Sequence, residues 1–149
     1  SYNLVRGLTD TSRAAIREAM ATYRASPGMT KGQLEAMLEP AFGKARAEAI
    51  ATTEVTRAYS HAQTSYQQRL TDAGIKTERI WLTANDEIAR RCPICWPKHQ
   101  KPESEWADAF PGGPPGHVRC RCALRLRVVD TKAWADNGHS SEALETLVV

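Results

Sequence analysis

The feature that most constrains the fold of this chain is a set of five side chains that can bind one metal ion. Cys92 and Cys95 form a C-x-x-C knuckle, and a tight turn between them can aim both sulfurs at one point about 2.3 Å from a zinc ion. The second cluster reads H-x-x-C-x-C and contains His117, Cys120 and Cys122. A C-x-x-C alone is a weak signal, but two such clusters on either side of a Gly/Pro-rich loop are a strong one. The sequence therefore predicts one bound Zn²⁺ that joins the two clusters.

A zinc site usually takes four protein ligands, so one of the five donors is in excess. Cys92, Cys95 and Cys120 are the first choices, and the sequence leaves the fourth place open between His117 and Cys122. Four protein ligands make a closed, structural site, whereas a position open to water would permit catalysis. Disulfide pairing of the same cysteines is the main alternative. The start of the chain shows no apolar signal segment, which favours metal binding.

The bulk composition is that of an ordinary globular domain and excludes few classes of function. The 149 residues are 42% hydrophobic and 25% charged, which is enough for one domain with an apolar core. A net charge of +3 is too small to indicate nucleic-acid binding by itself. No run approaches the ~20 apolar residues of a membrane-spanning helix, so we expect no membrane partner. The first residue is Ser rather than Met, which is consistent with a piece of a longer protein.

Residues 1–73 are rich in alanine and contain few Gly or Pro, and they predict helices. A first helix is expected to begin at Thr9 or Asp10, either of which can cap the free amides of the first turn. A second helix is expected after Thr30, where Gln33 completes a capping box.

The third predicted helix is the longest, from Lys44 to Asp72, with Gly74 in the usual position after a helix end. Its apolar side chains recur at helical spacing, which predicts that they pack on one side. These residues are Ala51, Val55, Ala58, Tyr59, Ala62, Tyr66 and Leu70.

Residues 75–130 hold all four cysteines and most of the prolines, and they predict short strands and loops. One strand is expected at residues 79–83 and a second at residues 123–129, where apolar and basic residues alternate. The predicted fold class is therefore α+β. A helical N-terminal half with one long helix is expected to pack on a small β module whose segments are connected by zinc ligation.

We expect a single domain over residues 1–130, made of helices in 1–73 and the zinc and β module in 75–130. Residues 131–149 are expected to form a C-terminal tail with a short helix at Ser141–Leu147, to which the sequence assigns no role.

Four motifs in this order carry a resemblance to a known family. They are TEVTRAY at residues 53–59, WLTAND at 81–86, CPIC at 92–95 and HVRCRC at 117–122. Their order and spacing resemble the phage Mu F-like minor head protein family, also known as the phage head morphogenesis domain, over roughly residues 30–129. Three positions depart from the family pattern. Ser60 replaces an Asn, Val118 replaces a Pro, and an Asp-Gly pair is missing after the knuckle.

The resemblance implies a structural minor capsid protein of a tailed phage or prophage, acting in head morphogenesis near the portal and inside the shell. Its expected partners are other capsid proteins, namely the portal and the major head protein, with packaged DNA as a further candidate. Its expected location is the virion, and the host cytoplasm during assembly.

Three charged residues are expected to brace the structure around the metal. Glu54 and Arg57 lie three residues apart on the long helix and match the family pattern, so the resemblance implies that they hold the helix against the zinc module. The alternative is a surface ion pair worth well under ~1 kcal/mol. Asp86 precedes the knuckle, where it can orient a ligand or cap a turn.

Two other classes of function stay open. A metal-dependent nuclease or peptidase would need an open coordination site and a general base, for which the sequence offers only Glu54, Asp86, Glu87 and the spare histidine. No catalytic residue is assigned. A zinc-finger-like nucleic-acid-binding module would use basic side chains near the second cluster and on the second strand. They are Arg119, Arg121, Arg125 and Arg127.

Overall fold

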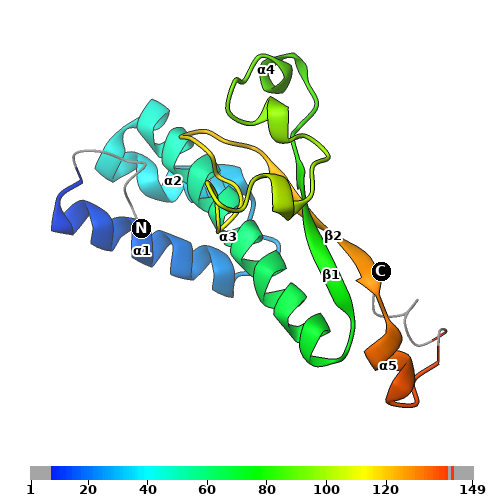
Figure 1. Cartoon of the computed structure of the whole chain (residues 1–149). Helices are drawn as coiled ribbons and strands as arrows, with labels where there is room; N and C mark the ends of the chain where they lie inside the picture. The colour runs from blue at the N-terminus through cyan, green and yellow to red at the C-terminus, as the bar shows by residue number, and fades with distance from the viewer. Residues whose placement is uncertain (1–7, 141, 143–149) are drawn as a thin grey trace.

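The structure is a computed structural model and describes residues 8–140 and residue 142. Three helices come first, followed by a two-stranded sheet whose strands are separated by the cysteine-containing segment (Figure 1). The main elements are α1 (Asp10–Ala25), α2 (Lys31–Phe42), α3 (Lys44–Asp72), β1 (Lys76–Leu82), α4 (Glu87–Arg90), β2 (Ala123–Asp130) and α5 (Lys132–Asp136). The predicted α+β class is confirmed. The helix predicted at Ser141–Leu147 lies almost entirely outside the described residues.

Both predicted helix starts are confirmed by side-chain caps. Thr9 Oγ1 accepts the amide N–H of Ser12 at 3.1 Å at the start of α1. At the start of α2, Thr30 Oγ1 accepts the Gln33 amide at 3.2 Å, and Gln33 Oε1 accepts the Thr30 amide at 2.8 Å. These reciprocal bonds satisfy amides that the helix itself leaves free.

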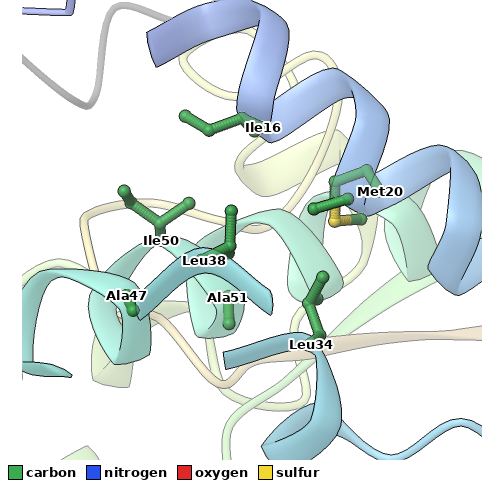
Figure 2. Close-up of a cluster of buried hydrophobic side chains, with 8 residues drawn as sticks. Ile16, Met20, Leu34, Leu38, Ala47, Ile50 and Ala51 are labelled. Carbon is green, nitrogen blue, oxygen red and sulfur yellow. The ribbon is translucent and has the colours of Figure 1, made fainter. Parts of the chain in front are cut away.

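The three helices share one apolar core (Figure 2), whose side chains converge between α1, α2 and the first half of α3. Eight residues of this core are buried, and two of them, Leu34 and Ala51, are fully inaccessible. The eight residues are Ile16, Ala19, Met20, Leu34, Leu38, Ala47, Ile50 and Ala51. Small residues of α3 at this contact allow the helices to approach closely, as the alanine-rich sequence predicts.

The predicted packing side of α3 is only partly correct. Ala51 and Leu70 are buried, but the Tyr59 side chain is 61% exposed. The helix instead also buries a polar side that contains Thr53, Thr56 and Ser60. The reason is that α3 is covered twice, by α1 and α2 on one side and by the cysteine-containing segment and the sheet on another. The helical spacing of the apolar residues could not predict the contact of α3 with the cysteine-containing segment and the sheet.

β1 and β2 pair in an antiparallel register that includes Arg79 opposite Leu126 and Leu82 opposite Ala123. β1 begins at Lys76, earlier than the predicted start at residue 79, because β2 continues to Asp130 and provides partners for the extra residues. The other edge of β1 is met by the segment around Pro102, which forms a bridge to Ile80.

The short helix α5 lies against the corner between α3 and β1. Trp134 is buried with Leu70 and Ile75, and its amide donates to the Gly74 carbonyl at 3.1 Å. Gly74 has a φ of +93°, and a Cβ built there would lie 2.7 Å from the Trp134 amide nitrogen. The division into a domain over 1–130 and a tail from residue 131 stays a prediction. No helix within the described part of the chain is long and apolar enough to cross a bilayer.

Candidate metal centre

The C-x-x-C segment follows α4, a single turn whose N-terminal cap is Asp86. Asp86 Oδ1 accepts the Ala89 amide at 2.8 Å, and the Cys92 amide donates to the Ala89 carbonyl at 3.1 Å. The Cys95 amide then donates to Cys92 Sγ at 3.3 Å. An amide N–H that points at a sulfur favours the thiolate, which is the form that binds a metal.

Two threonines of α3 fix the backbone of the second cluster. The Arg119 amide donates to Thr53 Oγ1 at 2.9 Å, and the Thr56 hydroxyl donates to the Cys120 carbonyl at 2.5 Å. Arg119 has a φ of +65°, an unusual conformation for a residue with a side chain. These buried bonds hold the second cluster against the middle of the long helix.

The structure brings all five predicted donors into two overlapping groups. Cys92, Cys95 and His117 form one group, and Cys95, Cys120 and Cys122 form the other, with the ligand atoms of each group within 4.8 Å of one another. Cys95 Sγ lies 3.8 Å from Cys120 Sγ, and Cys92 Sγ lies 3.3 Å from His117 Nε2. Sulfurs bound at about 2.3 Å to a tetrahedral zinc ion are ~3.8 Å apart, whereas a disulfide requires ~2.05 Å.

The contacts of His117 favour binding of a metal through Nε2. Its Nδ1 lies 2.7 Å from the Val118 carbonyl oxygen, so Nδ1–H donates there and the Nε2 lone pair is directed toward Cys92. Burial lowers the pKa of His117, but the Val118 carbonyl and the nearby sulfurs of Cys120 and Cys92 outweigh burial and raise it. A metal ion would therefore compete with a proton for Nε2.

The four sulfurs are crowded enough to shift one another's pKa values. Hydrogen bonds from the thiols of Cys122 and Cys95 lower the pKa of Cys120 to about 2. The neighbouring Cys120 raises the pKa of Cys95 strongly and that of Cys122 to about 12. Burial opposes ionisation of Cys92, but the amides of Cys95 and Ile94 outweigh burial and lower its pKa. A divalent cation would relieve this mutual repulsion, so the donor set fits a zinc ion.

Aromatic side chains enclose one side of the sulfur cluster. Trp81 is fully buried and meets Trp106 edge to face, with ring centroids 5.3 Å apart and an interplanar angle of 75°. Phe110 meets Trp81 in the same way at 5.6 Å. Trp81 and Trp106 share one buried cluster with Cys95, Cys120 and Cys122. These rings exclude water from the buried sulfurs.

The cavity beside the donors is small. Its volume is about 50 Å³, and it is lined by four of the five donors together with Ala84, Ile88, Ala89, Arg119 and Arg121. No carboxylate lines it among the described residues. A space of this size holds a metal ion or a few waters, and it is well below the ~300 Å³ of the smallest typical ligand pocket.

Three of the four arginines predicted as candidate nucleic-acid contacts form ion pairs within the chain. Arg119 Nη1 lies 3.2 Å from Glu48, Arg121 Nη2 lies 2.7 Å from Asp86, and Arg127 Nε lies 2.7 Å from Glu78. Arg125 has no ion-pair partner within residues 8–140. The Asp86–Arg121 pair links the knuckle side of the site to the second cluster. The Ala89 amide and Arg121 together lower the pKa of Asp86.

Glu54 and Arg57, the predicted brace on α3, pair with each other within the helix, whereas Asp86 pairs with Arg121 of the second cluster. Glu54 is 6% exposed, and its Oε2 lies 3.4 Å from Arg57 Nε within the same helix. Hydrogen bonds that join α3 to the second cluster come instead from Thr53 and Thr56, which the sequence analysis did not single out, and from the Ala45 carbonyl, which accepts from Arg119 Nη2 at 3.0 Å. Their signal was two threonines three residues apart in an alanine-rich helix. The bracing role of Glu54 and Arg57 stays a prediction.

A comparison with models of protein families covers the stretch that contains these residues. The chain matches the family model described as Phage Mu protein F like protein over residues 14–125, a stretch that contains α2, α3, β1 and all five donors. This match covers most of the chain, and the protein therefore belongs to the phage Mu F-like family, as its motifs indicated. Neither a curated protein nor a solved structure matches the chain.

Proposed function

We propose that this protein is a structural minor head protein that acts in phage head morphogenesis near the portal. Membership of the phage Mu F-like family carries this proposal. The proposed partners are the portal and the major head protein, and the proposed location is the virion after assembly in the host cytoplasm. The phage role thus rests on the family, whereas the chemistry of the site rests on the structure.

The proposed cofactor is a zinc ion with a structural role. Cys92, Cys95 and Cys120 would hold it, with His117 or Cys122 as the fourth ligand. The observation that supports this is the convergence of five donors from two distant segments on overlapping groups that share Cys95. The ion would tie the knuckle to β2 and close the long connection between the two strands.

A structural role fits the site better than catalysis. The cavity of about 50 Å³ that four of the donors line is too small for a substrate. A second cavity, of about 280 Å³, is bordered by Cys122, and no Asp, Glu or His is among the described residues that line it. Asp86, one of the candidate general bases considered above, is already engaged by the Ala89 amide and by Arg121. Glu87 pairs with Arg91 on the exposed side of α4. A hydrolytic site needs a base that is free to accept a proton from water, and neither carboxylate is placed for that.

Nucleic-acid binding is likewise less well supported than a structural role. Arg119, Arg121 and Arg127 each face a carboxylate, which reduces the positive potential that a phosphate backbone would meet. These pairs are about half exposed and individually weak, so a direct test is appropriate. Binding of a DNA duplex at ~50 mM salt that falls steeply as salt rises would support this alternative.

The zinc proposal is tested by metal analysis of the full chain purified without chelator. We expect about one zinc per chain and at least three thiols that react with a thiol reagent only after chelation. No metal, together with thiols that appear only after reduction, would show disulfides and would contradict the proposal.

The assembly proposal is tested by co-expression with the portal and major head proteins of the same phage or prophage. We expect the chain to sediment with assembled head particles and to be detected in them by mass spectrometry. Recovery of the chain only in the slow-sedimenting fractions, with normal heads present, would contradict a role in the head. The metal analysis is independent of this outcome.

A further inference from the structure

A groove runs along one side of α3, between the end of α1 and the Pro/Gly loop, and none of the five metal donors lines it. It consists of two cavities of about 490 Å³ and 400 Å³ that share Arg57 and His61. Arg24 and two alanines of α3 complete the first cavity. Thr64 and the loop of residues 109–116 complete the second. The two cavities together are thus far larger than a single ion requires.

Arg57, which is common to both cavities, has hydrogen-bond donors without acceptors. Its Nε and Nη2 atoms are buried and have no hydrogen-bond partner within the described part of the chain. Glu54 Oε2, at 3.4 Å from Nε, is farther away than the ~2.8 Å of a charge-assisted hydrogen bond. A buried donor that is left unpaired costs free energy. The Arg57 side chain as a whole is 32% exposed and lines both cavities, so an acceptor from outside the chain can approach it there.

The other polar side chains of the groove are also free to meet an anion. Arg24 and His61 form no ion pair or side-chain hydrogen bond with any described residue. Among the residues that line the two cavities there is no Asp or Glu. Glu54 is 6% exposed, pairs with Arg57 inside the chain and lines neither cavity. The planar guanidinium fork of arginine matches a carboxylate, which it can bind through two parallel N–H groups.

We infer that this groove is a docking site for an extended acidic segment of a partner protein, with an Asp or Glu carboxylate of that segment bound to Arg57. Charge complementarity selects the carboxylate. The lining favours a peptide, because Ala58, Ala62, Ala109, Phe110 and three prolines place apolar surface beside the basic side chains. Double-stranded DNA would instead need a broad basic surface, and the carboxylate of Glu54 reduces the positive potential at this point.

The test is a titration of the full, metal-loaded chain with two blocked peptides, followed by amide chemical shifts. The probe peptide is acetyl-Ala-Glu-Ala-Glu-Ala-amide, and its control carries Gln at both Glu positions. We expect the probe to shift amides of α3 around Arg57 and of residues 109–116, and the Gln peptide to bind about tenfold more weakly. A single-stranded DNA oligonucleotide and inorganic phosphate are titrated in parallel.

Three variants separate docking from folding. Arg57→Lys keeps a positive charge for Glu54 but loses the fork, and we expect about tenfold weaker binding of the probe. Arg24→Ala changes only an exposed wall, and we expect a loss of about two- to threefold. Arg125→Ala removes an exposed arginine that lies outside the groove, and binding should stay unchanged.

Equal binding of the Glu and Gln peptides would overturn the inference, because the carboxylate would then play no part. Tighter binding of the oligonucleotide or of phosphate at the same amides would assign the groove to phosphate and would also overturn it. No shift with any probe would show that the groove binds no acidic segment, with the same consequence. None of these results depends on the role of the protein in the phage head.

Discussion

The helical half, made of α1 to α3, and the module, made of the two strands and the cysteine-containing segment between them, are stabilised in different ways. In the helical half, Leu34, Leu38 and Ile50 from α2 and α3 are at most 1% exposed and form a continuous apolar core. In the module, the buried cluster consists of cysteines, two tryptophans and one leucine around a two-stranded sheet. A sheet of two strands is marginally stable alone. The difference teaches that the first region can fold by burying apolar surface, whereas the second has little apolar surface to bury and would depend on the proposed ion to join its sulfurs.

The long helix α3 belongs to both regions and explains how they are joined. Ala47, Ile50 and Ala51 pack into the helical core, while Thr53 and Thr56 bond the backbone beside Cys120. The helix therefore presents apolar side chains to one region and hydroxyls to the other. Loss of the metal should consequently loosen the module without unfolding the helices.

The largest expected effect comes from Cys95→Ser, because Cys95 belongs to both groups of donors. Removing this thiolate should weaken zinc binding by more than about a hundredfold, beyond the loss expected for a residue next to a ligand. Amide protection should disappear from β1 and β2 and persist in α1 and α3, as measured by hydrogen exchange. One tightly bound zinc and unchanged protection in the variant would refute the comparison.

Cys122→Ser and His117→Gln sharpen the same measurement. Whichever variant retains nearly normal zinc content identifies the donor that is in excess.

The second effect is that of Leu34→Ala in the helical core. Leu34 is 0% exposed, and its truncation should lower the free energy of unfolding of the helical half by about 3 kcal/mol. Zinc content should remain at about one per chain. The control is Met37→Ala on the same helix, where the side chain is 40% exposed and the loss should be under ~1 kcal/mol. Urea unfolding followed by circular dichroism measures both, and equal losses in the two variants would contradict this assignment of the core.

The third effect tests the corner that α5 covers. Gly74→Ala places a Cβ within 2.7 Å of the Trp134 amide nitrogen at a φ of +93°, so both strain and displacement of α5 are expected. We expect a loss of about 2 kcal/mol in the free energy of unfolding. Gly28→Ala is the matched control, with a φ of +87° and no atom within 4 Å of the added Cβ. Its loss should be about 1 kcal/mol, and an equal loss in both variants would show that α5 does not depend on this contact.

The smallest effect concerns Glu103, which accepts the Arg79 Nε–H at 2.6 Å and a Gln67 amide at 3.0 Å. Burial raises the pKa of Glu103, but these donors outweigh burial and lower it below its ordinary value of 4.5. Because the folded pKa is the lower one, the stabilisation is complete above about pH 4.5 and is lost as the pH falls through the folded pKa. Glu103→Gln should therefore cost about 1 kcal/mol at pH 7.

The pH dependence provides the control for Glu103→Gln. The difference in stability between the wild type and the variant should shrink as the pH falls below 4.5, measured by denaturant unfolding of protein kept in excess zinc at each pH. A difference that stays constant between pH 7 and pH 3 would show that the ion pair contributes nothing.

Much of the fold could be predicted because its signals are local. The caps at Thr9 and Thr30, the bounds of α3 and the end of that helix before Gly74 all follow from residues within a few positions of one another. The five donors could also be predicted, since a knuckle and a second cluster have characteristic spacing. The choice of four among them could not, because it depends on how two segments meet in space.

The sequence by itself determined the first three helices, the fold class, the family and the candidate donor set. The tertiary structure alone decided which faces of α3 are buried, where β1 begins, which carboxylates the arginines meet and where α5 lies. The physical reason is distance along the chain. A helix cap is formed by neighbours, whereas the bond from Thr53 to Arg119 spans 66 residues, and the one from Arg79 to Glu103 spans 24. Contacts of that kind exist only after the chain has folded.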